Sequence, residues 1–315
     1  MDPKVSVLIP LYNSASYIAD AIKSVLNQSW QNLEVIIVDD GSTDVSLDIA
    51  EKFISDKVSI YKQQNKGACA ARNLAFEHAS GDYIQYLDAD DILHPEKIST
   101  QVALVQQYGK HVLLSAKWAK FKDSTQLEEV LFPTRGIDKD YLVPIDWLID
   151  SWNGLGFGAV HTWLTPSEVV EKAGPWNEEL AINQDGEFFS RVILNVKEIR
   201  HVADAKVYYR TGNVHSISQQ KREKKAASLL KSFTLYEKNL LPSIDTFPVR
   251  KALHRNYSNF IYEHYPEYPE LTAVARQQML GLGFESIQPK TGKVFSAVSK
   301  IFGAETTLKL RGLLK

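Results

Sequence analysis

Cysteine, long apolar runs and excess charge of either sign are scarce in this chain of 315 residues. Cys69 is the single cysteine, so no internal disulfide can form, and the composition fits a reducing compartment. No apolar run approaches the ~20 residues that a membrane-spanning helix needs. The net charge of −2 gives no global basic signal, and we therefore expect no nucleic-acid partner.

Motifs of two nucleotide-binding classes are also missing. The sequence contains neither the Gly-x-Gly-x-x-Gly of a dinucleotide fold nor the Gly-x-x-x-x-Gly-Lys-Ser/Thr of a P-loop. The first residues lead directly into a strand pattern without an apolar signal segment, which predicts a cytoplasmic protein. The apolar fraction of 44% predicts a globular fold with a substantial core.

The first hundred or so residues alternate between short apolar runs and segments with helical spacing. This alternation predicts βαβ units and a doubly wound, mostly parallel sheet flanked by helices. Strands are expected at residues 5–10, 33–38, 58–62 and 82–87. Helices are expected at residues 15–28, 45–53, 67–78 and 95–108. Pro10 is expected to end the first strand, and Pro95 to lie in the first turn of the last helix.

The pattern loosens after residue 110. Strands are expected at residues 112–121 and 202–210, short helices at 166–173 and 186–194, and an irregular, pocket-forming stretch at 132–158. Helical spacing dominates from residue 219, with helices at 222–240, 249–265 and 270–282. We therefore predict an α/β domain over residues 1–215 and a helical C-terminal region over residues 216–315.

Three carboxylates, Asp88, Asp90 and Asp91, follow the predicted strand at 82–87. Like charges this close repel one another, and a divalent cation offsets the repulsion. Oxygen ligands favour Mg²⁺, Mn²⁺ or Ca²⁺ over zinc. Open α/β sheets bind ligands at the carboxyl ends of their strands, so this segment predicts a metal-dependent ligand site.

Other strand ends carry further candidates. Tyr12 follows the first strand, where an aromatic ring can stack on a planar base, although a packing role is the alternative. Asp39 ends the second strand and can accept hydrogen bonds from a base or a ribose. The residues after it, Ser42, Thr43 and Asp44, have the composition of a turn and a helix cap, which favours structural roles.

Gly67 marks the start of a predicted helix, and Arg72 lies one to two turns further on. A helix N-terminus attracts anions, and an arginine in this position can reach the same ligand. The alternative is an exposed arginine that only improves solubility.

Taken together, these segments resemble glycosyltransferase family 2, whose members adopt the GT-A fold. The resemblance is carried by residues 5–13, 38–44, 66–67, 71–73 and 87–91, in matching order and spacing. It is strong over residues 4–110 and recognisable to about residue 218. It implies a metal-dependent, inverting transfer of a sugar from a nucleotide-diphospho-sugar, usually a UDP-sugar, to a saccharide or lipid-linked saccharide, as in surface polysaccharide or lipopolysaccharide synthesis.

The resemblance also implies roles for individual residues. Residues 1–110 would bind the donor, and residues 111–215 would supply the acceptor side and the catalytic base. The base of the nucleotide would contact Tyr12 and Asp39, with Arg72 assisting, and Asp88 would face the ribose or a metal-bound water. The expected donor-binding residues are Pro10, Tyr12, Asp39, Lys66, Arg72, Asp88, Ala89, Asp90 and Arg210. The expected ligands of Mg²⁺ or Mn²⁺ are Asp90, Asp88 and His215.

Residues 184–191 resemble the family's acidic segment at the start of a helix. The family often has Glu-Asp there, whereas this chain has Gln184 and Asp185. Asp185 is therefore the expected base that deprotonates the acceptor hydroxyl, with a helix N-cap as its alternative role. Glu187 is a second candidate, although a first-turn carboxylate that favours the helix dipole suits it better.

Two tryptophans, Trp176 and Trp163, are candidates for stacking on a sugar face. Burial in the core is the alternative for both and the preferred interpretation for Trp163.

The tail carries an apolar helical face between residues 292 and 302, formed by Val294, Phe295, Val298, Ile301 and Phe302. Lysines flank this face, as is typical of a basic amphipathic helix on an anionic membrane. The protein would then be peripheral on the cytoplasmic face. Docking on the protein's own body or on a second subunit is the alternative.

Two other functions compete with sugar transfer. A non-catalytic module that binds a nucleotide sugar or Ca²⁺ is favoured only by Gln184. A phosphatase with Asp88 as nucleophile also begins from Asp-x-Asp at a strand end, but Ile92 stands where that family has Thr or Val.

Overall fold

The computed structural model describes residues 2–109, 111–212, 222–290 and 293–313. The chain forms two compact units, each discontinuous in sequence. Unit 1 consists of residues 1–147, 156–178 and 191–216. Unit 2 consists of residues 148–155, 179–190 and 217–315.

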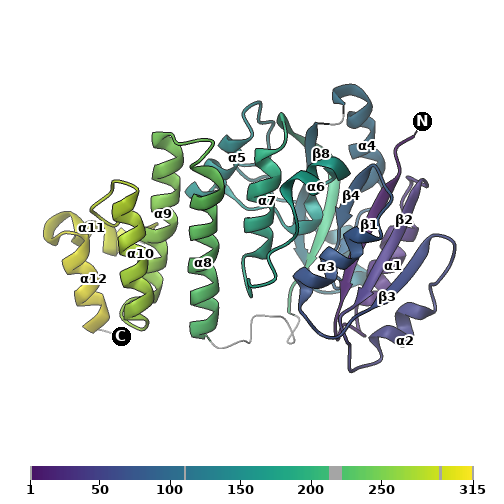
Figure 1. Cartoon of the computed structure of the whole chain (residues 1–315), viewed down its shortest axis with the longest axis horizontal. Coiled ribbons are helices and arrows are strands. Elements are labelled where there is room, and N and C mark those ends of the chain that lie inside the picture. Colours follow the sequence, from purple (N-terminus) through teal and green to yellow (C-terminus); the bar gives the residue numbers. More distant parts are fainter. Residues whose placement is uncertain (1, 110, 213–221, 291–292, 314–315) are drawn as a thin grey trace. The chain divides into compact units, whose positions relative to one another are not determined.

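The main sheet of unit 1 has the strand order β3-β2-β1-β4-β7 within the described residues (Figure 1). Its parallel strands are β1 (Val5–Leu11), β2 (Leu33–Asp39), β3 (Val58–Lys62) and β4 (Tyr83–Tyr86). The short edge strand β7 (Thr165–Pro166) pairs antiparallel with β4. All seven residues of β1 are buried, as expected for a parallel strand with both faces covered. The predicted α/β class and parallel strands are confirmed.

Helices connect these strands and begin later than the sequence predicts. They are α1 (Ile18–Leu26), α2 (Ser46–Glu51), α3 (Ala68–Glu77) and α4 (Lys97–Tyr108). Before α1, the carbonyl of Ser14 accepts N–H bonds from both Tyr17 and Ile18, so this segment is a turn that precedes the helix. Pro95 lies two residues before α4, so its predicted place in the first turn is wrong.

Pro10 lies inside β1 and does not end it. The carbonyl of Leu8 accepts the N–H of Leu87 at 3.0 Å, whereas the carbonyl of Leu11 accepts that of Asp40 at 2.8 Å. The backbone N–H and C=O groups of even-numbered residues in β1 therefore point toward β4, and those of odd-numbered residues point toward β2. The nitrogen of Pro10 points toward the side where β4 has already ended at Tyr86, so its missing N–H costs no ladder bond.

A second sheet in unit 1 has the order β5-β8-β6 within the described residues. Its strands are β5 (Ile92–Leu93), β6 (Val112–Phe121) and β8 (Glu198–Arg210). The prediction for residues 112–121 is confirmed, and β8 begins four residues before its predicted start at residue 202. The register places Arg210, at the end of β8, opposite Phe121.

Several short helices lie between β6 and β8. Residues Ile145–Asp150 form α5, residues Ser151–Leu155 form a π-helical turn, and residues Ser167–Ala173 form α6. Short 3₁₀ turns occupy residues Ser124–Glu129 and Val160–Thr162. The prediction of an irregular stretch over residues 132–158 is therefore wrong for residues 145–155.

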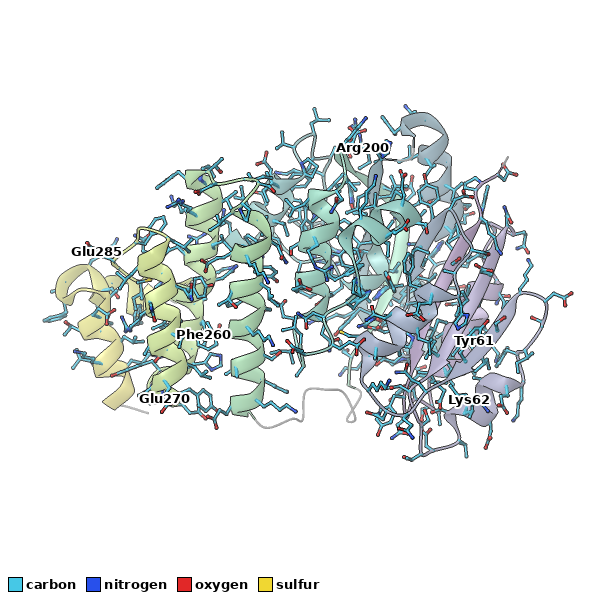
Figure 2. All side chains as sticks on the ribbon, in the orientation of Figure 1. Tyr61, Lys62, Arg200, Phe260, Glu270 and Glu285 are labelled. Carbon is cyan, nitrogen blue, oxygen red and sulfur yellow. The ribbon has the colours of Figure 1, made fainter. Side chains whose placement is uncertain are left out.

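Unit 2 is helical, as predicted for the C-terminal region. Its long helices are α8 (Arg222–Leu240), α9 (Phe247–His264) and α10 (Pro269–Gly281), followed by α11 (Lys293–Phe302) and α12 (Ala304–Leu313). Phe260 of α9 is buried, and its ring centroid lies 6.5 Å from that of Phe233 of α8 (Figure 2). The helix α7 (Gln184–Leu194) contributes residues 184–190 to this unit. Among the described residues, none of the helices combines the length and apolar character that crossing a bilayer requires.

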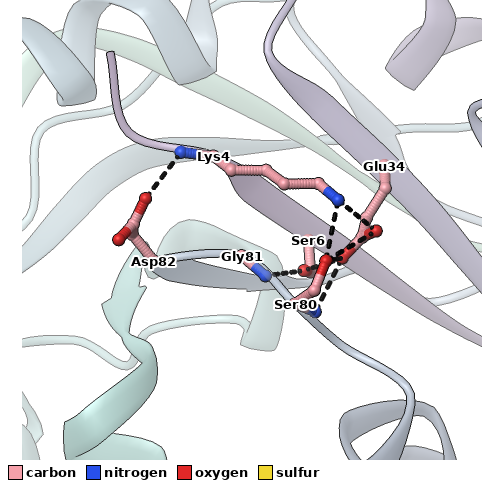
Figure 3. A network of polar contacts seen from close by, with 6 residues as sticks. All are labelled: Lys4, Ser6, Glu34, Ser80, Gly81 and Asp82. Carbon is pink, nitrogen blue, oxygen red and sulfur yellow. Dashed lines mark hydrogen bonds and ion pairs between the residues drawn. The ribbon is translucent and has the colours of Figure 1, made fainter. Parts of the chain in front are cut away.

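A polar cluster closes the main sheet at the amino ends of its strands (Figure 3). Glu34 of β2 accepts hydrogen bonds from Lys4 Nζ at 2.6 Å, Ser6 Oγ at 2.6 Å and the N–H of Ser80 at 2.8 Å. The N–H of Gly81 donates to Ser6 Oγ at 2.8 Å. A Cβ at Gly81 would lie 2.6 Å from the nitrogen of Ser6, so only glycine fits there. The cluster therefore ties β1 and β2 to the turn that precedes β4.

Candidate functional site

Two adjacent carboxylates lie at the carboxyl end of β2, where Asp39 and Asp40 are both 3% exposed. Asp39 accepts the N–H of Ser42 at 3.2 Å. Asp40 accepts the N–H of Lys66 with Oδ1 and that of Gly67 with Oδ2, both at 2.8 Å. Asp40 therefore fixes the turn that leads into α3, a role that the sequence analysis missed.

The loop after β1 is cross-linked to the loop after β2. Asn13 has a φ of 44°, and its N–H donates to Ser42 Oγ at 3.1 Å. The N–H of Thr43 donates to Asn13 Oδ1 at 2.8 Å, and Asp44 Oδ1 accepts the N–H of Ser46 at 2.9 Å. These bonds give Ser42, Thr43 and Asp44 the structural roles favoured from the sequence. Tyr12, beside this cross-link, is 47% exposed and presents an open aromatic ring.

Arg72 lies in α3 and is 6% exposed, so the alternative of an exposed, solubilising arginine is wrong. Its Nη2 lies 2.7 Å from Asp88 Oδ1, and its guanidinium carbon lies 4.5 Å from the centre of the Trp176 ring. The Trp176 ring holds the guanidinium of Arg72, and the guanidinium in turn fixes the orientation of the Asp88 carboxylate.

The loop that carries Trp176 is held by the next residue of α3. Asn73 Oδ1 accepts the N–H of Trp176 at 2.8 Å, and Asn73 Nδ2 donates to Glu178 Oε1 at 3.0 Å. Trp176 and Trp163 are 2% and 1% exposed. Neither ring offers a face to a sugar, so that interpretation is wrong for both.

Asp91 and His161 form a buried pair directly after the Asp-x-Asp segment. Their side chains are 2% and 0% exposed, and Asp91 Oδ2 lies 3.0 Å from His161 Nδ1. Asp91 Oδ1 accepts the N–H of Arg210 at 2.7 Å. Burial raises the pKa of the Asp91 carboxyl, while His161 acts in the opposite direction. Nothing in the local sequence points to His161, because the pair forms between residues 70 positions apart.

Arg210 is held on every side by protein groups. Its Nε donates to the carbonyl of Asp90 at 2.7 Å, and its Nη1 donates to the carbonyl of Lys122 at 3.1 Å. Its guanidinium carbon lies 4.7 Å from the ring of Tyr17 and 4.4 Å from that of Phe121. These contacts favour a role for Arg210 in positioning the acidic segment over direct contact with phosphate.

The side chains of Asp88 and Asp90 are partly exposed, whereas Ala89 between them is buried. Hard carboxylate oxygens at a strand end are the donors that Mg²⁺ and Mn²⁺ prefer, so this pair fits such an ion. Within the part of the chain that the structure describes, three or more His, Cys, Asp or Glu side chains nowhere gather to hold a metal. Oxygens of a bound diphosphate would have to complete the ligand set. His215, the other expected ligand, lies outside the described residues.

Asp185 lies in unit 2, at the second position of α7, and is partly exposed. The preceding Asn183 has a φ of 57°, and its Nδ2 donates to Ser232 Oγ at 2.7 Å and to the hydroxyl of Tyr236 at 2.8 Å. A Cβ at Gly186 would lie 2.3 Å from that hydroxyl, so this position in the first turn of α7 favours glycine. Side chains of α8 therefore define the backbone on both sides of Asp185.

Glu187 is 2% exposed and accepts a hydrogen bond from Asn239 Nδ2 at 3.1 Å. Its burial and this contact favour a structural carboxylate over a second base.

Comparison with known proteins gives consistent matches. Residues 6–154 match the model of glycosyl transferase family 2. The chain is 35% identical over 141 residues to the putative teichuronic acid biosynthesis glycosyltransferase TuaG of Bacillus subtilis, covering 44% of this chain and 56% of TuaG. It is 38% identical over 117 residues to glycosyltransferase GlyG of Streptococcus pneumoniae, covering 36% and 39%. The chain thus spans less than two thirds of either relative.

Solved structures share the fold at low sequence identity. TarS of S. aureus in complex with UDP-GlcNAc has a TM-score of 0.68 and 18% identity, covering 89% of this chain and 81% of that one. The mannosyltransferase PcManGT of Pyrobaculum calidifontis, in complex with GDP-Man and Mn²⁺, has a TM-score of 0.59 and 16% identity, covering 99% of this chain and 88% of that one.

Proposed function

Since this chain belongs to glycosyl transferase family 2 and has a fold of the GT-A type, we propose that it is a metal-dependent, inverting transferase. The donor would be a nucleotide-diphospho-sugar and the acceptor a hydroxyl of a saccharide or lipid-linked saccharide. The observation that carries the proposal is the Arg72–Asp88 contact of 2.7 Å beside Asp90, at the carboxyl ends of the parallel strands.

On the donor side, we assign the nucleotide to the end of β1 and β2. The exposed ring of Tyr12 would stack on the base, and Asp39 would accept a base N–H. Arg72 would hold the Asp88 carboxylate toward the ribose or a metal-bound water. Asp90 and Asp88 would hold Mg²⁺ or Mn²⁺, which, when bound, neutralises charge that builds on the leaving diphosphate.

Asp185 is the proposed base. Its carboxylate would take the proton of the acceptor hydroxyl as the acceptor oxygen bonds to the anomeric carbon. The bond from that carbon to the diphosphate oxygen breaks in the same step, which inverts the anomeric configuration. Asp185→Asn should reduce kcat by 10²-fold or more with little change in the KM for the donor. Transfer near the wild-type rate would remove Asp185 from this role.

The similar proteins guide the choice of donor and acceptor. TarS binds UDP-GlcNAc and TuaG is named for teichuronic acid biosynthesis, which supports a UDP-sugar donor and a surface polysaccharide product. The mannosyltransferase holds GDP-Man with Mn²⁺, which supports a divalent ion at the diphosphate. We retain residues 1–215 as the proposed transferase domain.

The donor site is tested by thermal shift with a panel of nucleoside diphosphates and nucleotide sugars, each with and without Mn²⁺. A ligand that binds the native state raises the melting temperature by mass action. We expect one nucleotide to stabilise the protein in a metal-dependent way, and Asp90→Ala to abolish that shift. Asp48→Ala, an exposed aspartate on α2, is the matched control and should keep it. No shift with any nucleotide would favour the phosphatase, which a trapped aspartyl-phosphate at Asp88 would identify.

We also propose that α11 contacts an anionic membrane surface. Val294 and Ile301, two helical turns apart, are 79% and 76% exposed, and Phe302 is 58% exposed. Phe295 instead packs on Tyr262 of α9 with ring centroids 4.8 Å apart, so the predicted single apolar face is divided between the protein body and solvent. Residues 286–315 carry six Lys or Arg and one Glu, which favours anionic lipid over a second copy of the same basic surface.

Vesicle sedimentation tests this contact. The protein should pellet with vesicles of phosphatidylcholine and phosphatidylglycerol but not with phosphatidylcholine alone. Val294→Asp combined with Ile301→Asp should abolish pelleting, whereas Leu131→Asp, at a residue of unit 1 that is 90% exposed, should not. Equal pelleting of all three proteins would exclude α11 as the contact.

A further inference from the structure

The π-helical turn at residues 151–155 is held in an uncommon conformation within unit 2. Gly154 has a φ of 84°. Arg255 of α9 donates to Asn153 Oδ1 at 2.9 Å, and Lys290 Nζ lies 3.4 Å from the carbonyl of Gly154. Single π-helical turns occur frequently at functional sites, because they redirect one side chain out of the helical pattern.

The side chain that this turn presents is Trp152. Its ring is partly exposed and lies against Tyr236 of α8, with ring centroids 4.8 Å apart and planes inclined by 38°. This ring contact holds the indole, while part of the Trp152 side chain stays open to solvent.

Tyr236 connects this indole to the start of α7. The tyrosine hydroxyl accepts a hydrogen bond from Asn183 at 2.8 Å and lies against the backbone of Gly186. Burial raises the pKa of Tyr236, and the carboxylates of Asp185 and Glu187 raise it further. Trp152 and Gly186, the residue after Asp185, therefore both lie against the same buried tyrosine.

We propose that Trp152, together with Asp185 and Gln184, forms the subsite for the acceptor saccharide. The C–H face of a pyranose packs on a fixed aromatic ring, while carboxylate and amide groups bond its hydroxyls. Gln184 is partly exposed, and its Nε2 donates to the carbonyl of Leu180 at 2.7 Å, which fixes its side chain next to Asp185. Buried Trp163 and Trp176 cannot serve in this way. The inference rests on the proposed function, because it names the acceptor side of that reaction.

The test measures nucleoside diphosphate release from the preferred UDP-sugar with Mn²⁺, with and without p-nitrophenyl pyranosides as acceptors. In the wild-type protein, at least one pyranoside should accelerate release. Trp152→Ala should raise the KM for that pyranoside about tenfold or more, with an unchanged KM for the donor. Trp152→Phe, which keeps a ring, should stay within about threefold of the wild type.

Trp30 provides the matched control, because it is another partly exposed tryptophan and lies in unit 1. Trp30→Ala should leave the pyranoside KM unchanged, and thermal melts of all variants separate misfolding from loss of binding. If the donor binds but no pyranoside affects its turnover, the saccharide assignment is overturned. If Trp152→Ala is folded and keeps the wild-type pyranoside KM, the position of the subsite is overturned. Absence of donor binding would instead contradict the proposed function.

Discussion

Arg72 illustrates what a sequence motif conveys about a single residue. The motif placed an arginine one to two turns into a helix at the ligand edge, and the structure gives it Asp88 as a partner. It did not convey that the guanidinium is buried under Trp176, because that contact joins residues 104 positions apart. Asp40, His161 and Tyr236 were missed for the same reason, since their partners come from distant segments.

Arg72→Lys should reduce kcat/KM about tenfold or more, because a lysine is a point charge that cannot both orient Asp88 and cover the Trp176 ring. Steady-state kinetics with the preferred donor measure this. Arg200→Lys, at an arginine paired with Asp140 at 2.7 Å (Figure 2), should leave kcat/KM unchanged. Equal effects of the two substitutions would contradict the role of Arg72.

His161→Leu should destabilise the protein by about 3–5 kcal/mol, because it leaves the buried carboxylate of Asp91 without its partner. Combining it with Asp91→Asn should recover part of the loss, since no buried charge then remains. Urea unfolding of the wild type, both single variants and the double variant measures the coupling. Additive losses would show that the two side chains do not stabilise one another.

At the scale of elements, strands were predicted better than helix ends. The strand at residues 58–62 and the helix at residues 222–240 were predicted with their observed bounds. Continuous apolar runs identify buried parallel strands, because both faces of such strands are covered. Helix starts depend on turns such as the one at Ser14, and the short β5 and the π-helical turn depend on tertiary contacts. These features leave little trace in local sequence.

The polar cluster that joins β1, β2 and the turn before β4 contains one titratable carboxylate with a shifted pKa, Glu34. Because of Glu34, the free energy of unfolding should depend on pH in the acid range. The hydrogen bonds of the cluster hold the pKa of Glu34 below the ordinary value of 4.5, against the opposing effect of burial. The stabilisation is therefore present above pH 4.5 and is lost as the pH falls through the lower, folded-state pKa. Glu34→Gln should cost about 1 kcal/mol at pH 7 and less at pH 3.

Thermal melts at the two pH values measure this difference. Glu51→Gln, which removes the exposed pair with Lys62, should change the melting temperature little at either pH. A loss for Glu34→Gln that is equal at both pH values would contradict the linkage.

At the scale of the whole molecule, each compact unit is built from three segments that are separated in the sequence. No local sequence pattern reveals which segments belong together. Residues 148–155 and 179–190 belong to the same unit as the C-terminal helices. Asn183, for example, bonds Ser232 and Tyr236, about 50 residues away. The predicted boundary near residue 215 rests on a change of periodicity, which registers the type of secondary structure but not its contacts.

A chain shortened to residues 1–215 should consequently be poorly soluble or partly unfolded. It would lose the α8 partners of Asn183 and of the buried Glu187. Far-UV circular dichroism, size-exclusion chromatography and thermal melts of the shortened chain, beside the full chain, measure this. A monomer with a cooperative melting transition like that of the full chain would show that residues 1–215 fold alone.

Gly186 has a consequence for how natural variation in this protein should be interpreted. The space beside its backbone is filled by the hydroxyl of Tyr236, so any side chain there disturbs the fold before it affects chemistry. Selection for folding alone would keep a glycine at this position, even in descendants that had lost all activity. Invariance next to Asp185 would therefore be poor evidence for catalysis, whereas drift of Asp185 itself in chains that keep Gly186 would mark inactive lineages.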